Sequence, residues 1–357
     1  MFKSLSLFAL LLASASSVIS KPTEVEKHTY LDIKTVCKQT PKLGLFGQLL
    51  EERPDIYKAY VDLRDKTFYL PSDDALNAYY EATGNIFRRA VDDVAKASYQ
   101  YVNGQVDLND AREKKRLAKK SGDNKNTVVI SNNASRRRNK RQLTVGNDTV
   151  TTAGITASTG LGTKSEILFG DIHCTQGLIQ VVDTLFTVPV PIIETLDCTN
   201  GSEFLGALND ADLADTYNDM GNVTFFTPQD GSFEANSTMD CASIQRHVVE
   251  NEALYTPDLK DGDVIESASG ENLYVNILDD EFYINCVRVI TTDNIVSNGV
   301  IHVVEKVIEP MSAPPSCWAK NTTVEPVKFT GSAPTNQAGS ILAIVGSLTA
   351  LFFCSLV

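Results

Sequence analysis

The sequence lacks the short motifs that mark many enzyme active sites. It has no Gly-x-Ser-x-Gly turn and no His-Glu-x-x-His pair, so no motif in it indicates a hydrolase. It also has no Cys-x-x-Cys pair, which argues against thiol redox chemistry and a zinc site. Residues 160–165 contain glycines and a lysine but no adjacent Gly-Lys, so they do not form a phosphate loop. We therefore assign no catalytic residue, no metal ligand and no cofactor, and expect a protein that is not an enzyme.

Positive charge is scarce outside one segment. The chain has 32 Lys+Arg against 45 Asp+Glu, a net charge of −13. Residues 112–141 hold 12 of the bases and only 2 of the acids, so the rest of the chain is strongly acidic. An acidic surface repels phosphate groups, and we expect no nucleic-acid partner. The hydrophobic content of 43% is typical of a globular protein.

Both ends of the sequence have the layout of targeting segments. Residues 1–20 join Lys3 to an apolar run and then small residues, as in a secretory signal peptide. The tail 341–357 is uncharged and apolar but short for a bilayer span, which needs about 20 residues. Small residues beginning at Gly331 precede it by a polar spacer, the layout of a GPI-anchor signal with attachment at Gly331. A true transmembrane tail is the alternative. Residues 313–340 are expected to form a stalk.

The cysteines and glycosylation sequons fit the secretory route. Of seven cysteines, Cys354 would leave with the tail, and an even number remains. We treat these six as disulfide candidates: Cys37, Cys174, Cys198, Cys241, Cys286 and Cys317. Six Asn-x-Ser/Thr sequons are candidate glycosylation sites: Asn133, Asn147, Asn200, Asn222, Asn236 and Asn321.

The sequence contains the same structural unit twice. The run 298–310 opens with Asn-Gly, continues with β-branched apolar residues and ends at a proline, as a strand buried on both faces would. The run 176–185 repeats its pattern, with Gly177 at the place of Gly299. Further upstream, a short strand around 68–70 ends at a proline and precedes a helix.

The remaining segments have simpler patterns. Residues 33–60 show helical spacing of apolar side chains. Residues 222–233 mirror the first strand, proline and helix in the second unit. Residues 107–165 are rich in charge and then in Thr, Ser, Gly and Asn, which predicts a disordered basic insertion. Within it, 136–141 resembles a basic processing site, with a solvated charge run as the alternative. The pair Asp279-Asp280 is interpreted as a hairpin turn.

Two histidines invite a catalytic or metal-binding interpretation. His247 and His302 each lie in a β-branched apolar run, and neither has a nucleophile or third ligand beside it. We interpret both as neutral, hydrogen-bonded core residues. Gln100 and Gln180 stand at the matching places of the first unit. Glutamine can replace a neutral histidine as donor and acceptor but cannot act as a general base.

Four motifs in this order resemble those of the fasciclin-type (FAS1) cell-adhesion domain. They are Thr224–Phe233, Arg246–Val249, Leu254–Gly262 and Asn298–Glu305. The resemblance covers nearly all of 191–310. The first unit matches more loosely, in 67–76 and 176–185, and the family's two histidines fall on Gln100 and Gln180.

The resemblance implies an α+β fold, with a β-wedge or sandwich-like sheet and packed helices in each of two tandem domains, 32–190 and 191–312. It also implies a fungal-type, GPI-anchored adhesion or matrix-interaction protein on the cell surface. The implied partners are other cell-surface or matrix proteins and glycans, and the membrane itself through a lipid anchor or a C-terminal span. The alternative is a membrane-attached protein of the vacuole or lysosome that acts in trafficking or membrane fusion.

Overall fold

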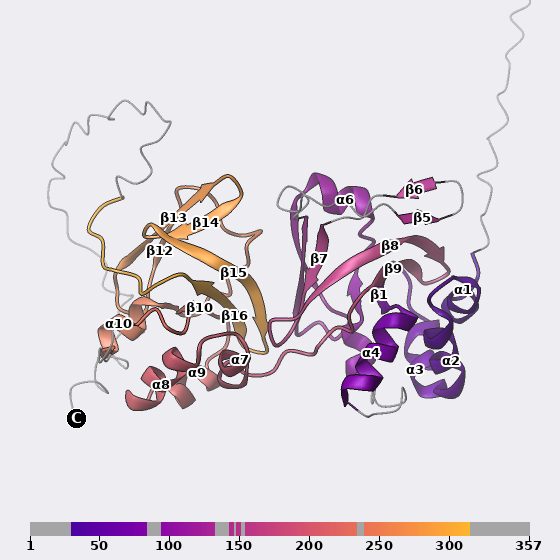
Figure 1. The fold of residues 1–357 in the computed structure, drawn as a ribbon, viewed down its shortest axis with the longest axis horizontal. Coiled ribbons are helices and arrows are strands. Elements are labelled where there is room, and N and C mark those ends of the chain that lie inside the picture. Colours follow the sequence, from indigo (N-terminus) through magenta and orange to yellow (C-terminus); the bar gives the residue numbers. More distant parts are fainter. Residues whose placement is uncertain are drawn as a thin grey trace, which may run out of the picture.

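The computed structural model describes residues 30–83, 94–132, 143–145, 148–150, 154–233 and 239–314, which form two domains side by side (Figure 1). The helices are α1 (Ile33–Gln39), α2 (Gly44–Glu52), α3 (Pro54–Val61), α4 (Asp73–Thr83), α5 (Val94–Tyr99), α6 (Leu108–Glu113), α7 (Ile192–Cys198), α8 (Ser202–Asp210), α9 (Ala214–Asp219) and α10 (Cys241–Arg246). The strands of domain 1 are β1 (Lys66–Pro71), β2 (Tyr101–Asn103), β3 (Arg116–Lys120), β4 (Thr127–Asn132), β5 (Leu143–Val145), β6 (Asp148–Val150), β7 (Ile155–Ser158), β8 (Lys164–Cys174) and β9 (Gly177–Val182). The strands of domain 2 are β10 (Val223–Pro228), β11 (Val248–Val249), β12 (Val264–Glu266), β13 (Asn272–Leu278), β14 (Glu281–Ile284), β15 (Val287–Val296) and β16 (Gly299–Val304).

The two main sheets have the same topology. Their strand orders are β2-β1-β9-β8-β7-β4-β3 and β11-β10-β16-β15-β14-β13-β12. In each, one parallel pair lies beside an antiparallel meander: β1 with β9, and β10 with β16. The ends of each sheet approach one another through the N–H of Gly122 to the carbonyl of Tyr101 and the N–H of Ala268 to the carbonyl of Val248, both at 2.8 Å. The sheets are therefore barrel-like, and the predicted α+β class is confirmed.

Each domain has one apolar core between helices and sheet and another inside the barrel. In domain 1, Phe68 faces the helices and Tyr69 faces the barrel interior, because successive strand residues point to opposite faces. In domain 2, Phe225 and Phe226 divide in the same way. The central strands β9 and β16 are buried along their whole length, as the β-branched runs predict.

Local sequence signals explain where the helices begin. The Asp32 carboxylate accepts hydrogen bonds from the backbone N–H groups of Lys34 and Thr35, which caps α1. Asp240 caps α10 in the same way through the N–H of Ser243. Pro54 occupies the first turn of α3, where its missing N–H costs no hydrogen bond. The predicted helical segment 33–60 is thus three short helices.

The prediction of a disordered insertion is wrong for most of residues 107–165. Residues 107–132 form α6, β3 and β4, and 155–158 form the buried strand β7. The basic strand β3 was not predicted because charged residues dominate its composition, although Leu117 packs against the barrel core and only Lys120 is exposed. The basic run 136–141 lies outside the described residues.

Part of this segment forms the contact between the domains. Val129 of β4 packs with Ile295 and Val300 of domain 2, and all three are buried. Beside this contact, the Lys115 ammonium lies 3.2 Å from the Asp280 carboxylate, and the Arg116 guanidinium donates to the Asp280 carbonyl at 3.2 Å. The apolar contact contributes most of the stabilisation, since exposed ion pairs are worth only about 0–1 kcal/mol.

We expect a trypsin-like protease to cut first between Arg136 and Gln142, and the two fragments to stay associated under native conditions. The reason is that 133–154 connects β4 to β7, which pair along the sheet from Val129↔Ser158 to Asn132↔Ile155. Gel filtration of the digest, followed by denaturing electrophoresis, measures both properties. A chain with the basic residues of 136–141 replaced by glutamine is the control. Native separation of the fragments, or first cuts elsewhere, would contradict this expectation.

Candidate functional site

The Asn-Gly pair of the repeated motif lies at the start of β16 in domain 2. A Cβ at Gly299 would lie 1.8 Å from the Val223 carbonyl oxygen, so only glycine permits this approach of β16 to β10. Just before it, the Asn298 amide donates to the carbonyls of Tyr217 and Met220, at 2.8 and 2.9 Å. Asn298 thereby satisfies carbonyls at the end of α9, which would otherwise lack partners. The Asn-Gly pair thus joins a helix end to the central strand.

His302 lies three residues further along β16 and is fully enclosed. Its Nε2–H donates to the Leu254 carbonyl at 2.8 Å, and its Nδ1 accepts from the Asp293 N–H at 3.3 Å. Asp293 lies in a bulge of β15 with a left-handed φ of 58°. Its carboxylate accepts from the N–H and hydroxyl of Thr256, at 2.8 and 2.6 Å. Burial lowers the pKa of His302, so the ring is neutral and both nitrogens are used internally.

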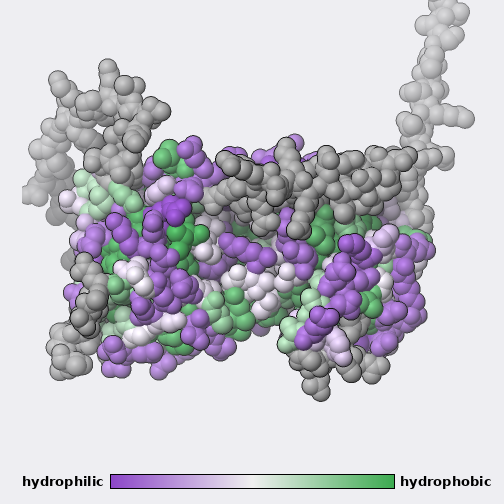
Figure 2. Space-filling model, in the orientation of Figure 1, coloured by the Kyte–Doolittle hydropathy of each residue, from purple (hydrophilic) through white to green (hydrophobic). Residues whose placement is uncertain are grey.

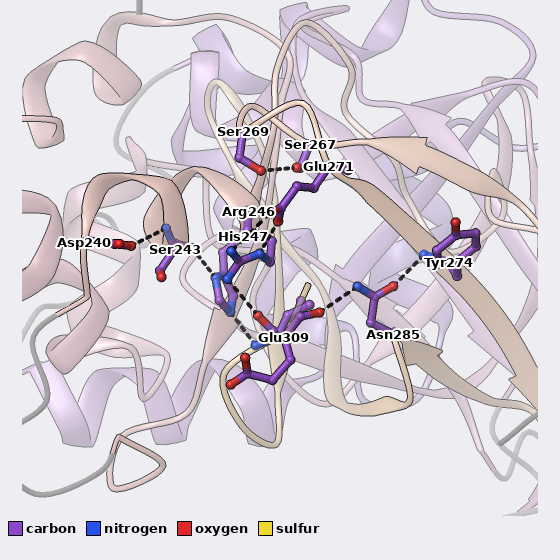
Figure 3. Close-up of polar contacts among 11 residues, drawn as sticks. Asp240, Ser243, Arg246, His247, Ser267, Ser269, Glu271, Tyr274, Asn285 and Glu309 are labelled. Atoms are coloured by element: carbon purple, nitrogen blue, oxygen red, sulfur yellow. Dashed lines mark hydrogen bonds and ion pairs between the residues drawn. The ribbon is translucent and has the colours of Figure 1, made fainter. Parts of the chain in front are cut away.

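His247 and its neighbours hold the segment that follows the last strand (Figure 3). The His247 Nδ1–H donates to the Ser243 carbonyl at 2.8 Å, and Nε2 accepts from the Ile308 N–H at 2.9 Å. Arg246, which is ion-paired with Glu271, reaches the Ile308 carbonyl at 3.4 Å. Burial lowers the pKa of His247 to about 4.

Asn285 completes this arrangement. Its amide nitrogen donates to the Glu309 carbonyl at 3.0 Å, and its oxygen accepts from the Tyr274 N–H at 2.8 Å (Figure 3). Arg246, His247 and Asn285 together bind two consecutive residues of the chain as it leaves the domain. We call these three side chains the C-terminal clamp.

Domain 1 builds the same centre from different residues. A Cβ at Gly177 would lie 1.9 Å from the Lys66 carbonyl oxygen. The Gln180 amide donates to the Val106 carbonyl at 3.0 Å and its oxygen accepts from the Asp171 N–H at 3.1 Å. These are the bonds that His302 makes in domain 2. The equivalent residues are Gly177 and Gly299, Gln180 and His302, Asp171 and Asp293, and Val106 and Leu254.

Gln100 is the domain 1 counterpart of His247. The Tyr69 N–H donates to the Gln100 carbonyl, as the Phe226 N–H donates to that of His247. The Gln100 amide donates to the Phe186 carbonyl at 3.1 Å. Phe186 follows Gly177 by the same number of residues as Ile308 follows Gly299. Both domains therefore hold the segment after their central strand through this position.

Several known proteins are similar in sequence to this chain. The family model described as "Fasciclin domain" matches residues 199–310. A "Fasciclin-like arabinogalactan protein" of Arthroderma benhamiae is 32% identical over 179 residues, covering 48% of this chain and 40% of that protein. "Fasciclin-like arabinogalactan protein CTB11" of Cercospora beticola is 26% identical, covering 44% of each chain.

Residues 199–310 of this chain form a fasciclin domain. The chain spans less than half the length of these two relatives. Human periostin is 26% identical over 162 residues, which are 42% of this chain and 19% of periostin. The solved FAS1 domain pair of the insect cell adhesion molecule Fasciclin I is 17% identical, covers 76% of this chain and 98% of that pair, and has a TM-score of 0.35.

The fasciclin motifs are structural in this chain. Each motif residue joins two elements of the domain. The missing side chain of Gly299 allows two strands to approach, and hydrogen bonds do the same for Asn298, His302 and His247. These contacts support our interpretation of the histidines. A cavity of about 220 Å³ lies elsewhere, between α4 and the segment 183–187, and neither histidine lines it. Within the described ranges, no group of three or more His, Cys, Asp or Glu side chains is placed to hold a metal ion.

Sequence reasoning missed several residues of these centres. Asp171 and Asp293 each precede the motif glycine by the same spacing, so comparing the repeats could have identified them. Glu271 and Asn285 carry no such signal, because their partners are distant in the sequence.

The other predicted sites are distributed over the surface and the core. Asn200 and Asn222 are exposed, with left-handed φ angles of 63° and 55°, while the sequons at Asn133, Asn147, Asn236 and Asn321 lie outside the described residues. Cys241 and Cys286 are disulfide-bonded. Cys37, Cys174 and Cys198 carry free thiols. Cys317 and the predicted anchor site Gly331 also lie outside the described part.

We expect His302→Gln to leave domain 2 folded and His302→Asp to unfold it. Glutamine can donate to Leu254 and accept from Asp293, as Gln180 does in domain 1. Losing the stacked contact with Phe226 should cost about 1 kcal/mol. Aspartate would place an unpaired buried carboxylate beside Asp293 and should cost about 3 kcal/mol or more. Chemical denaturation measures both free energies of unfolding.

The repeats also supply a control for this experiment. Gly170 makes room for Gln180, since a Cβ there would lie 1.6 Å from the Gln180 Oε1, and Thr292 occupies the equivalent place in domain 2. If His302→Gln is unstable, adding Thr292→Gly should restore part of the loss. An unstable protein without such recovery would contradict the equivalence of the two centres.

We expect acid to destabilise domain 2 through His247. Its folded pKa of about 4 lies below the ordinary value of 6.5, so the unfolded chain takes up a proton first as pH falls. The resulting loss of folding free energy is absent above pH 6.5, grows as the pH falls toward 4, and amounts to about 3 kcal/mol. His247→Gln should remove it, since Gln100 shows that glutamine can hold the equivalent segment. The test compares unfolding free energies near pH 7 and pH 4 in both proteins. Equal acid losses would contradict the role of His247.

Proposed function

We propose that this fasciclin-domain protein is a non-enzymatic adhesion or matrix-interaction module held at the cell surface. The proposal rests on one observation, which is that the side chains of the motif residues bond to other parts of the same domain. His247, His302 and Asn298 are committed to bonds inside the domain, so the motif supplies a stable fold and not a reactive site.

The exposed surface supports polar, individually weak contacts with cell-surface or matrix proteins and glycans. On the face drawn in Figure 2, hydrophilic residues surround scattered hydrophobic ones. Among the described residues, the large hydrophobic side chains with high exposure are Tyr30, Leu31, Tyr80, Val264 and Leu278. Single contacts of this kind gain strength when many copies act together on one surface.

The proposed attachment is a GPI anchor at Gly331, and the part of the stalk before it, residues 313–331, would join the anchor to domain 2. Among the residues that the structure describes, no helix is both long and apolar enough to cross a bilayer. The C-terminal clamp supports the proposal because it fixes Ile308 and Glu309, the last part of the domain before the stalk. Tension arriving from an anchored stalk would therefore reach β16 through a held segment.

A vacuolar or lysosomal protein acting in trafficking or fusion is the alternative. The location of a tagged full-length protein separates the two alternatives.

We expect beads that carry residues 21–312 at high density to attach to cells or matrix, and sparsely coated beads to attach far less. Both domains are included because they bury Val129, Ile295 and Val300 between them. The attached fraction under gentle flow is measured against bead density, and a His302→Asp coat serves as the unfolded control. If dense coats attach no better than bare beads, the adhesion proposal is wrong.

A further inference from the structure

Two cysteines of domain 1 lie in the same buried part of its core. Cys37 of α1 and Cys174 at the end of β8 are 0% and 3% exposed and belong to the same buried cluster. Burial raises the pKa of the Cys37 thiol, and the neighbouring Cys174 raises it further. Both are thiols in the structure. The two cysteines thus share a region closed to solvent, and they lie near enough to interact electrostatically.

The backbone around these cysteines is fixed by hydrogen bonds that cross a large sequence separation. The Thr175 N–H donates to the Leu31 carbonyl at 2.9 Å, and the Ile33 N–H donates to the Gln176 Oε1 at 3.0 Å. The start of α1 is therefore fastened to the turn that follows Cys174. Cys37 lies just over one helical turn beyond this attachment.

Domain 2 has apolar residues at these two places. α7 is the counterpart of α1, with Ile192 at the place of Ile33, and this puts Leu196 at the place of Cys37. Counting back from Gly177 and Gly299 puts Val296 at the place of Cys174. Leu196 and Val296 are 0% and 3% exposed and share one apolar cluster.

The two repeats therefore differ at two sequence-distant positions of one cluster, and both differences are to cysteine. Independent changes at core positions would not favour the same residue type at both places. A cross-link explains the pair, since it needs both cysteines and gains nothing from one alone.

We propose that Cys37 and Cys174 form a disulfide that staples α1 to the end of β8. The inference rests on passage through an oxidising secretory compartment, which is part of the proposed localisation, and not on adhesion. A low-molecular-weight disulfide of the glutathione type is the oxidant. One thiolate attacks it and releases one thiol, and the other cysteine then attacks the mixed disulfide and releases the second. Overall, the two protein thiols give up two protons and two electrons to the oxidant.

The staple has a specific consequence for the chain. Residues 38–173 lie between the two cysteines, including β3, β4, β7 and the basic run 136–141. A cut in that run would leave two chains joined covalently as well as by strand pairing. Because both thiols are buried in the folded domain, the bond would form during folding, before α1 closes over Cys174.

The test is disulfide mapping of the full chain, secreted by eukaryotic cells and never exposed to reductant. The protein is denatured with an alkylating reagent present, digested, and analysed by mass spectrometry. The expected result is a peptide linking Cys37 to Cys174, with neither residue alkylated. Cys241 and Cys286 are the internal control, since their protection shows that the sample was oxidised.

Two variants keep the test decisive. The double change Cys37→Leu with Cys174→Val copies the pair of domain 2, so it should fold, lack the linked peptide and melt at a lower temperature than the oxidised parent. Cys37→Ser should leave Cys174 open to alkylation after denaturation. If Cys37 and Cys174 are both alkylated in the parent while Cys241 and Cys286 are protected, the proposal is wrong. Loss of adhesion with the linked peptide intact would count against the proposed function alone.

Discussion

The close approach of a glycine to the neighbouring strand is the constraint on which each domain depends. At Gly299 and Gly177, any side chain would collide with the carbonyl of Val223 or Lys66, and this contact fixes the register of the parallel pair. Parallel strands cannot be joined by a tight turn, so the pair must be formed by residues far apart in the chain. Once the register is set, the meander β12–β15 pairs with the free edge of β16, and its counterpart in domain 1 pairs with the free edge of β9. The helices then cover the face that the two strands present.

The same register explains why one position three residues after the glycine is polar. The neighbouring strand bulges there, and the bulge turns the N–H of Asp293 or Asp171 inward. A buried N–H without a partner would cost about 1–3 kcal/mol, so the facing side chain must accept a hydrogen bond. His302 and Gln180 both do this and both donate to a carbonyl on the other side. The two domains therefore satisfy one backbone requirement with two residue types, of which only histidine responds to pH.

The sequence predicted the parts of this fold that depend on local pattern. The paired Gly-containing runs, the strand that ends at Pro71 and the helix after it all appear as β9, β16, β1 and α4. The presence of Gln180 at the place of His302 led to the interpretation of a structural role, and both side chains donate to a backbone carbonyl inside their domain.

What the sequence did not reveal depends on contacts between distant segments. The turn role of Asp280 was visible, but its contact with Arg116 required the position of domain 1. The strand β3 was predicted to be disordered because charge dominates its composition, although it pairs with β4 along its whole length and Leu117 packs against the core. Polar surroundings therefore concealed a strand whose pairing partners, not its own residues, determine its conformation.

The path of force through the molecule follows from these contacts if the chain is anchored at its C-terminal end, as we propose. A pull on Glu309 first meets the C-terminal clamp and then runs along β16. Because β16 is paired on both sides, with β10 and β15, its ladder bonds would be loaded together in shear and would resist as a group. Val300 of the same strand also packs against domain 1 through Val129, so the load would spread to both domains. The strand that organises the fold would thus also carry the tension. A strand in this role needs an immobile, neutral core at His302. Any adhesive contact would then lie on the outer surface.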